Sequence, residues 1–286
     1  MEGGIKPKKS KKGLKIFIFI ILALAILIAG AYFVLAKSPT VPAQLNVEQG
    51  EVLANSQRVQ GNVKLKQGDI IETKQGGLAT VILYESVVIN IEENTKINID
   101  NLIKEHPEVS QESGETWNTF TKLAGVEGYT VKTGNSIASV RATAFGLKQD
   151  YIIGGEGTVD YEINGEDFSV FEKEVVETSA GTSVKRAASQ QEIQKIKLKI
   201  ERAVRQLKKL REVEIKKKQI VYNIIKSKTG FSDEEILGYL EDIDRGDIDV
   251  DELSRQSPVE LESIKKIAEI TKSIQNINRK MKELYG

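Results

Sequence analysis

The sequence predicts a multi-domain α+β protein with an N-terminal transmembrane helix, an all-β domain and a C-terminal α-helical hairpin or bundle. Three observations predict it: one long uncharged apolar run, then short alternating runs separated by glycine, then apolar residues at helical spacing. The expected limits are a cytoplasmic basic segment at 1–15, a transmembrane helix at 16–36, a linker at 37–46, the β domain at 47–184 and the helical region at 185–286.

The amino-acid composition excludes several kinds of functional site. The 286 residues are 40% hydrophobic and 29% charged, which is typical of folded protein. The chain has no cysteine, which excludes disulfides, thiolate zinc sites and cysteine nucleophiles. The zero net charge hides segregation: residues 1–15 carry +5, 40–184 carry −11, 185–228 carry +11 and 229–257 carry −8.

The apolar run at 16–36 has the length of a membrane span. Its 21 residues would reach roughly 30 Å as a helix, which matches the hydrocarbon core of a bilayer. Six lysines precede the run, so we expect a single-pass cell-membrane protein with a cytoplasmic N-terminus and an extracytoplasmic bulk. The alternatives are a signal peptide cleaved after Val34-Leu35-Ala36 and a pilin-like signal after Gly13.

Short β patterns follow the linker. Val63 and Leu65 alternate with charged residues, and a longer alternation runs over 78–84 after a Gln-Gly-Gly turn. Further runs lie at 87–91 and 97–99. Strands of this length at spacings of about 8–12 residues predict a sandwich, barrel or solenoid.

The segment from about Val47 to Asp160 resembles the FecR domain family. The features that carry the resemblance are Gly50-Glu51-Val52, Leu65, Gly68-Asp69, Thr73, Gly77, Ala79, Val81, Leu83, Asn94-Thr95, Gly114, Trp117, Val131, Thr133, Val140-Arg141-Ala142-Thr143-Ala144-Phe145 and Glu156-Gly157-Thr158-Val159. The resemblance implies a β-helical or solenoid-like fold and a non-catalytic sensing or interaction module. The regulator for which the family is named controls a sigma factor through a cytoplasmic domain, and the expected cytoplasmic segment of about 15 residues is too short for such a domain, so direct sigma-factor regulation is not expected.

Arg141 is a cation in an otherwise apolar strand pattern. An arginine beside Thr143 and Phe145 pairs most often with a carboxylate or backbone carbonyls, and Glu156 is one candidate partner. The alternative is a contact to an anion or to a partner peptide.

Two amphipathic helices are expected in the C-terminal region, with a shorter acidic one between them. The acidic helix has a capping-box signature at Ser232 and Glu235, and a third helix is expected to begin at Ser257-Pro258. Narrow heptad stripes indicate a coiled coil, a hairpin or faces for a partner helix. The candidate partner faces are Ile193, Ile196, Ile200, Leu207, Ile267, Ile270, Ile274 and Ile277.

The basic segment at 185–228 has two interpretations. Its cations form a solvated helix face, partly neutralised by the acidic segments, or they contact anionic lipid or an envelope polymer. Nucleic acid is not expected as a partner, because the segment is predicted to lie outside the cytoplasm and no aromatic residue interleaves the cations before Tyr222.

The acidic stretch at 241–253 is a weak calcium candidate. Its oxygen ligands would be Asp242, Asp244, Asp247 and Asp249. The stretch fails the EF-hand pattern in both registers, so a solvated acidic turn is favoured.

No catalytic residue, cofactor or metal site is predicted. The one histidine, His106, lies in a polar loop, and no phosphate-binding loop is present. The chain is therefore expected to be a non-catalytic binding module in envelope signalling or surface-complex assembly, with an envelope or surface protein, or a second copy, as partner. The alternatives are a structural protein that docks on anionic lipid or polymer through its basic helix, and a β-solenoid carboxylate hydrolase.

Overall fold

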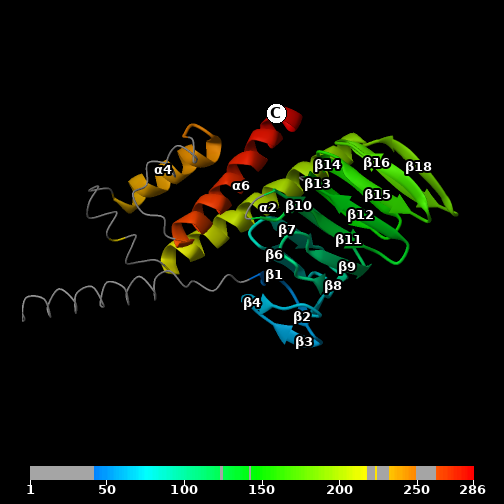
Figure 1. Ribbon diagram of the computed structural model, residues 1–286, viewed down its shortest axis with the longest axis horizontal. Helices are drawn as coiled ribbons and strands as arrows, with labels where there is room; N and C mark the ends of the chain where they lie inside the picture. The colour runs from blue at the N-terminus through cyan, green and yellow to red at the C-terminus, as the bar shows by residue number, and fades with distance from the viewer. Residues whose placement is uncertain (1–41, 123–124, 142, 218–222, 224–231, 249–261) are drawn as a thin grey trace, which may run out of the picture.

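The computed structural model describes residues 42–122, 125–141, 143–217, 223, 232–248 and 262–286. In these ranges the chain forms two nine-stranded sheets and three helices (Figure 1). Sheet 1 has the order β18 (Thr182–Ala187), β17 (Glu174–Ser179), β14 (Tyr151–Glu156), β13 (Thr143–Lys148), β10 (Thr116–Phe120), β7 (Val87–Ile91), β6 (Leu78–Leu83), β1 (Ala43–Gln49) and β4 (Asn62–Leu65). Sheet 2 has the order β16 (Glu166–Val170), β15 (Val159–Ile163), β12 (Ser136–Val140), β11 (Tyr129–Lys132), β9 (Glu108–Ser113), β8 (Lys96–Asn101), β5 (Ile70–Thr73), β2 (Val52–Ala54) and β3 (Gln57–Val59).

The chain crosses between the two sheets as it advances along the molecule. Hairpin β6–β7 lies in sheet 1, β8–β9 in sheet 2, β13–β14 in sheet 1, β15–β16 in sheet 2 and β17–β18 in sheet 1. Each sheet therefore grows in the same direction as the sequence, and both sheets keep open edges at their ends.

This pairing pattern corrects the expected β-helix. A β-helix stacks successive coils through parallel strands, whereas neighbouring strands here pair antiparallel, with β9 and β11 as the one parallel pair among the described strands. The two sheets form an extended sandwich, not a closed barrel or a solenoid.

The main core lies between the sheets. Alternate residues of each strand point inward, as the period of two requires. Its largest fully buried side chains are Tyr129, Tyr161, Phe145, Leu45, Ile71, Leu83, Ile89, Ile91, Ile97, Ile99, Leu147 and Ile152.

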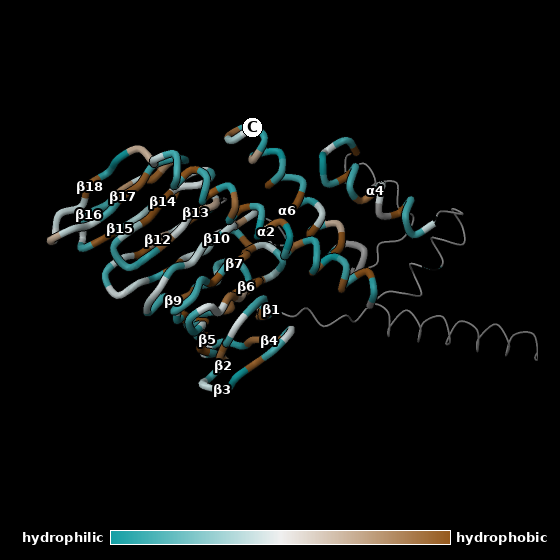
Figure 2. The backbone as a smooth tube through the Cα atoms, turned by 180° about the vertical axis from the view of Figure 1, so that it is seen from behind, coloured by the Kyte–Doolittle hydropathy of each residue, from teal (hydrophilic) through white to brown (hydrophobic). Residues whose placement is uncertain are grey.

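The helices lie against sheet 1 rather than in a separate bundle. Helix α2 (Gln190–Lys217) packs on β7, β10, β13 and β14, and α6 (Glu262–Tyr285) packs on α2. Helix α4 (Asp233–Arg245) contacts α6 and begins with the expected capping box of Ser232 and Glu235. Figure 2, seen from behind, shows α2 running across the row of strands with α6 beside it. A second apolar cluster thus joins helix residues such as Leu207 and Ile274 to Trp117 and Ile153 of the sheet.

The membrane part of the sequence-based prediction needs correction. No helix among the residues that the structure describes is long and apolar enough to cross a membrane. The span expected at 16–36 lies outside those residues. The structure therefore gives no support to the expected transmembrane helix or to the single-pass cell-membrane location that rested on it.

Candidate partner-binding surface

The two sheets differ in what lies over their outer faces. The outer face of sheet 1 carries α2, whose stripe of Ile196, Ile200 and Leu207 is buried against it. On sheet 2, by contrast, alternate side chains of β12, β15 and β16 remain exposed to solvent. The outer face of sheet 2 is therefore the sheet surface on which a partner could lie.

Local sequence rules build this surface. The run 159–170 alternates inward apolar residues with outward polar ones on both sides of Asn164-Gly165. Both turn residues have positive φ, 52° for Asn164 and 81° for Gly165, as a two-residue hairpin turn requires. The turn fixes the register, which pairs Glu162 with Asp167.

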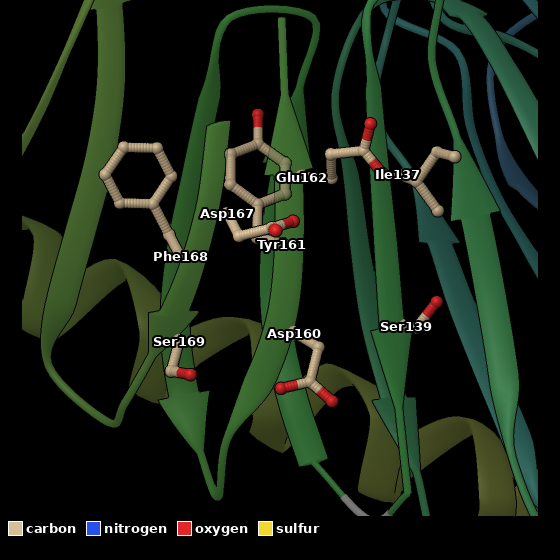
Figure 3. A pocket seen from close by; sticks show the side chains of 8 residues that line it. All are labelled: Ile137, Ser139, Asp160, Tyr161, Glu162, Asp167, Phe168 and Ser169. Atoms are coloured by element: carbon tan, nitrogen blue, oxygen red, sulfur yellow. The ribbon is translucent and has the colours of Figure 1, made fainter. Parts of the chain in front are cut away.

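The strand register places the outward side chains in two rows. One row crosses Ile137, Glu162 and Asp167, and the other crosses Ser139, Asp160 and Ser169. These six residues, together with Tyr161 and Phe168, line a surface depression of about 350 Å³ (Figure 3). We call this region the β12–β15–β16 face.

The β12–β15–β16 face combines unpaired negative charge with one exposed apolar side chain. Asp160, Glu162 and Asp167 form no ion pair or hydrogen bond with any side chain that the structure describes, and they belong to two adjacent strands. Ile137 lies opposite Glu162 and is 38% exposed. A cationic side chain would therefore find free carboxylates beside an apolar contact.

The neighbouring strands of sheet 2 differ because their charges are satisfied. Lys132 donates to Glu108 at 2.6 Å on the adjoining part of the same outer face. His106 lies within 2.7 Å of the Thr130 hydroxyl, between Nε2 and Oγ1. The unpaired carboxylates are thus confined to the β15–β16 end of the sheet.

Several basic residues of α2 form ion pairs with acidic residues of the same chain. Lys195 pairs with Glu115 at 2.6 Å, Lys199 with Glu92 at 2.6 Å and Lys208 with Asp244 at 3.0 Å. These pairs agree with the interpretation of a helix face neutralised by the acidic segments. Because these lysines are paired, little free positive charge remains on this side of the helix for docking on anionic lipid or polymer.

Arg202 of α2 is a buried cation that contacts sheet 1. Its guanidinium contacts Glu48 at 2.8 Å and Glu92 at 2.6 Å, and it donates to the Ala79 carbonyl at 3.0 Å. Burial alone would raise the pKa of Glu48, but hydrogen bonds from Arg202 and Thr80 hold that pKa below its ordinary value. The sequence offered no signal for this cluster, because its members are distant in the chain.

Arg141 lies in solvent. Its side chain is exposed, and it makes no ion pair with the part of the chain that the structure describes. The suggested partner, Glu156, faces Lys280 and Arg279 of α6 instead. Thr143, next to Arg141 in the pattern, donates its hydroxyl to the Glu156 carbonyl.

The candidate partner faces of the helices are covered within the chain. Ile196, Ile200, Leu207, Ile270, Ile274 and Ile277 are buried in the second apolar cluster, while Ile193 and Ile267 are partly exposed. The stripes therefore meet sheet 1 and each other.

The calcium candidates are occupied by cations of the protein. Asp244 accepts from Arg211, and Asp242 and Asp247 both accept from Arg245. Asp249 lies outside the described residues. Within the described ranges no three histidine, cysteine or acidic side chains group as metal ligands would.

Comparison with known proteins identifies one domain. Residues 69–152 match the model of the FecR protein family, which confirms the resemblance predicted for about 47–160. The chain thus contains a FecR domain that runs from the start of β5 into β14. No curated protein matches the chain.

Two solved structures show a limited likeness. Both are crystal structures of a "putative anti-sigma factor" from Parabacteroides distasonis ATCC 8503, at 2.50 Å and 1.65 Å resolution. In each case the identity is 17%, the TM-score is 0.39, and the match covers 44% of this chain and 62% of the other, less than two thirds of its length. A likeness of this size does not establish a common function.

Proposed function

Starting from the FecR domain at 69–152, we propose that this protein is a non-catalytic regulatory module of a signalling system. It acts by binding a protein partner on the β12–β15–β16 face. The FecR family resemblance supports the regulatory role, since the family is named for a regulator. Strand β12 belongs to the matched segment, and β15 and β16 follow it directly in sheet 2.

The observation that carries the proposal is the contrast between the two sheets. Strands β7, β10, β13 and β14 of sheet 1 are covered by α2, and the acidic residues beneath the helix are paired with its lysines and arginines. The β12–β15–β16 face keeps free carboxylates and an exposed isoleucine. Charge complementarity therefore assigns as partner a protein segment that carries lysine or arginine beside an apolar residue.

Complementation in the native host tests the proposal. The gene is deleted, and transcript abundance is compared after return of the wild type or of the triple variant Asp160→Lys, Glu162→Lys and Asp167→Lys. A matched control reverses three exposed carboxylates on the helices: Glu201→Lys, Glu212→Lys and Glu241→Lys. Both variants are first checked for an unchanged circular dichroism spectrum.

We expect deletion to change a defined set of transcripts. The wild type and the helix control restore that set, and the face variant does not, because reversed charges repel a cationic partner. Full restoration by the face variant would place the partner elsewhere. A deletion that changes no transcript would contradict the regulatory role.

A further inference from the structure

The last turn of α6 is held by three other parts of the chain. Lys173, between β16 and β17, donates to the Leu284 carbonyl at 2.6 Å, and Lys197 of α2 donates to the Tyr285 carbonyl at 2.9 Å. The Tyr285 hydroxyl donates to the carbonyl of Gly155 in β14. We call these five contact residues, Gly155, Lys173, Lys197, Leu284 and Tyr285, the C-terminal clamp.

Helix physics explains why lysines gather there. The last carbonyls of a helix have no partner within the helix, and the helix dipole places partial negative charge on them. Two ammonium groups satisfy these carbonyls, and Lys173 also lies 5.0 Å from the centre of the Tyr285 ring. The clamp is therefore electrostatic and depends on the local charge.

Glu156 introduces a titratable charge next to the clamp. It follows Gly155 at the end of β14 and is partly buried. The charged groups that face it are Arg279, Lys280 and Glu283 of α6 and Glu172 of the β16–β17 connection, with Tyr285 also near. Burial raises the pKa of Glu156 to about 7, Lys280 and Arg279 oppose the rise, and Glu172 and Glu283 add to it.

We propose that the C-terminal clamp is a pH-sensitive latch, which closes α6 onto β14 while the Glu156 carboxyl is protonated and loosens when that carboxyl ionises. Ionisation adds negative charge beside Glu172, Glu283 and the negative end of the helix. Opening would expose Met281 and Tyr285, which pack against the cluster between the helices and sheet 1. The latch thus links pH to the attachment of α6.

The sign of the pH dependence of closure follows from the pKa of Glu156. The closed state holds the Glu156 proton with a pKa of about 7, against an ordinary value of 4.5 in an opened, solvated turn. Closure is therefore strongest below the ordinary value, and that advantage is lost as the pH rises through 7. Between pH 6 and pH 8 the closed-to-open ratio should fall about tenfold.

Hydrogen exchange of the purified protein tests the latch. Exchange of the amides at 280–286 is measured at pH 6 and pH 8, and each rate is divided by the intrinsic rate at that pH. We expect wild-type protection to fall about tenfold, and Glu156→Gln, which stays neutral, to keep the same protection at both values. The control Glu201→Gln, on the exposed side of α2, should behave as the wild type.

A second variant tests the clamp independently of the titration. Tyr285→Phe removes the hydroxyl that reaches Gly155, so the last turn of α6 should lose protection at both pH values. A tenfold pH effect that persists in Glu156→Gln would overturn the proposal. So would wild-type protection in Tyr285→Phe.

Discussion

Arg202 of α2 and Glu48 of β1 lie 154 positions apart in the chain, and their side chains meet at 2.8 Å. The two side chains are only 8% and 15% exposed, so the contact is made largely out of water. The same guanidinium reaches Glu92 of the β7–β8 connection at 2.6 Å. One arginine thus fastens the helix to β1 and to the end of β7, two strands of sheet 1 that flank β6.

Arg202→Met should loosen α2. Without the guanidinium, Glu48 stays enclosed without its cation and Glu92 keeps only Lys199, and breaking a buried pair in this way costs about 3 kcal/mol or more. Urea unfolding followed by circular dichroism measures the loss. The exposed Arg205→Met is the matched control and should change stability by less than about 0.5 kcal/mol. Equal losses of stability at the two positions would show that the buried ion pair stabilises the fold no more than an exposed arginine does.

The Glu48 carboxylate should make the helix attachment sensitive to acid. Its pKa is held below the ordinary value of 4.5 in the folded state, so its contribution is present above 4.5 and is lost as the pH falls further. The melting temperature of the wild type should therefore drop between pH 5 and pH 3. Glu48→Gln should melt lower at pH 7 and show a smaller drop, and an unchanged drop would assign the acid sensitivity to other groups.

The apolar stripe of α2 should stabilise the isolated chain. Leu207 is 1% exposed, and truncation to alanine should cost about 2–5 kcal/mol through lost burial and a cavity. Leu198 on the same helix is 52% exposed, and Leu198→Ala should cost less than about 0.5 kcal/mol. If the stripe instead served a separate partner, both variants would have the same free energy of unfolding as the wild type.

The single tryptophan offers a probe of sheet 1. A Cβ added at Gly146 would lie 2.9 Å from three ring atoms of Trp117, closer than packed atoms tolerate. Gly146→Ala should therefore shift Trp117 fluorescence and destabilise the fold by about 1–3 kcal/mol. At Gly134 the nearest atom is 4.0 Å away, so Gly134→Ala should leave both readings as they are.

Local patterns in the sequence predicted much of the secondary structure. The alternation over 78–84 became β6, and the capping signature at Ser232 became the start of α4. Such features follow from neighbours within one element, where periodicity and capping are decided.

The pairing of distant segments could not be predicted in this way. Whether neighbouring strands run parallel or antiparallel depends on which segments meet, and β1 pairs with both β4 and β6. The covering of sheet 1 likewise depends on contacts such as that of Arg202 with Glu48. The β12–β15–β16 face was missed, although the alternation of Asp160 and Glu162 before Asn164-Gly165 could have indicated it.

The most direct test of the account places a photocrosslinking amino acid at Ile137, on the β12–β15–β16 face, and separately at Leu198, on the exposed side of α2. After irradiation of living cells, crosslinked peptides are sequenced by mass spectrometry. We expect an adduct from position 137 with a partner segment that contains lysine or arginine, lost in the Asp160→Lys, Glu162→Lys and Asp167→Lys background. An adduct from position 198 with none from position 137 would contradict the account, since it would place the partner on the helices.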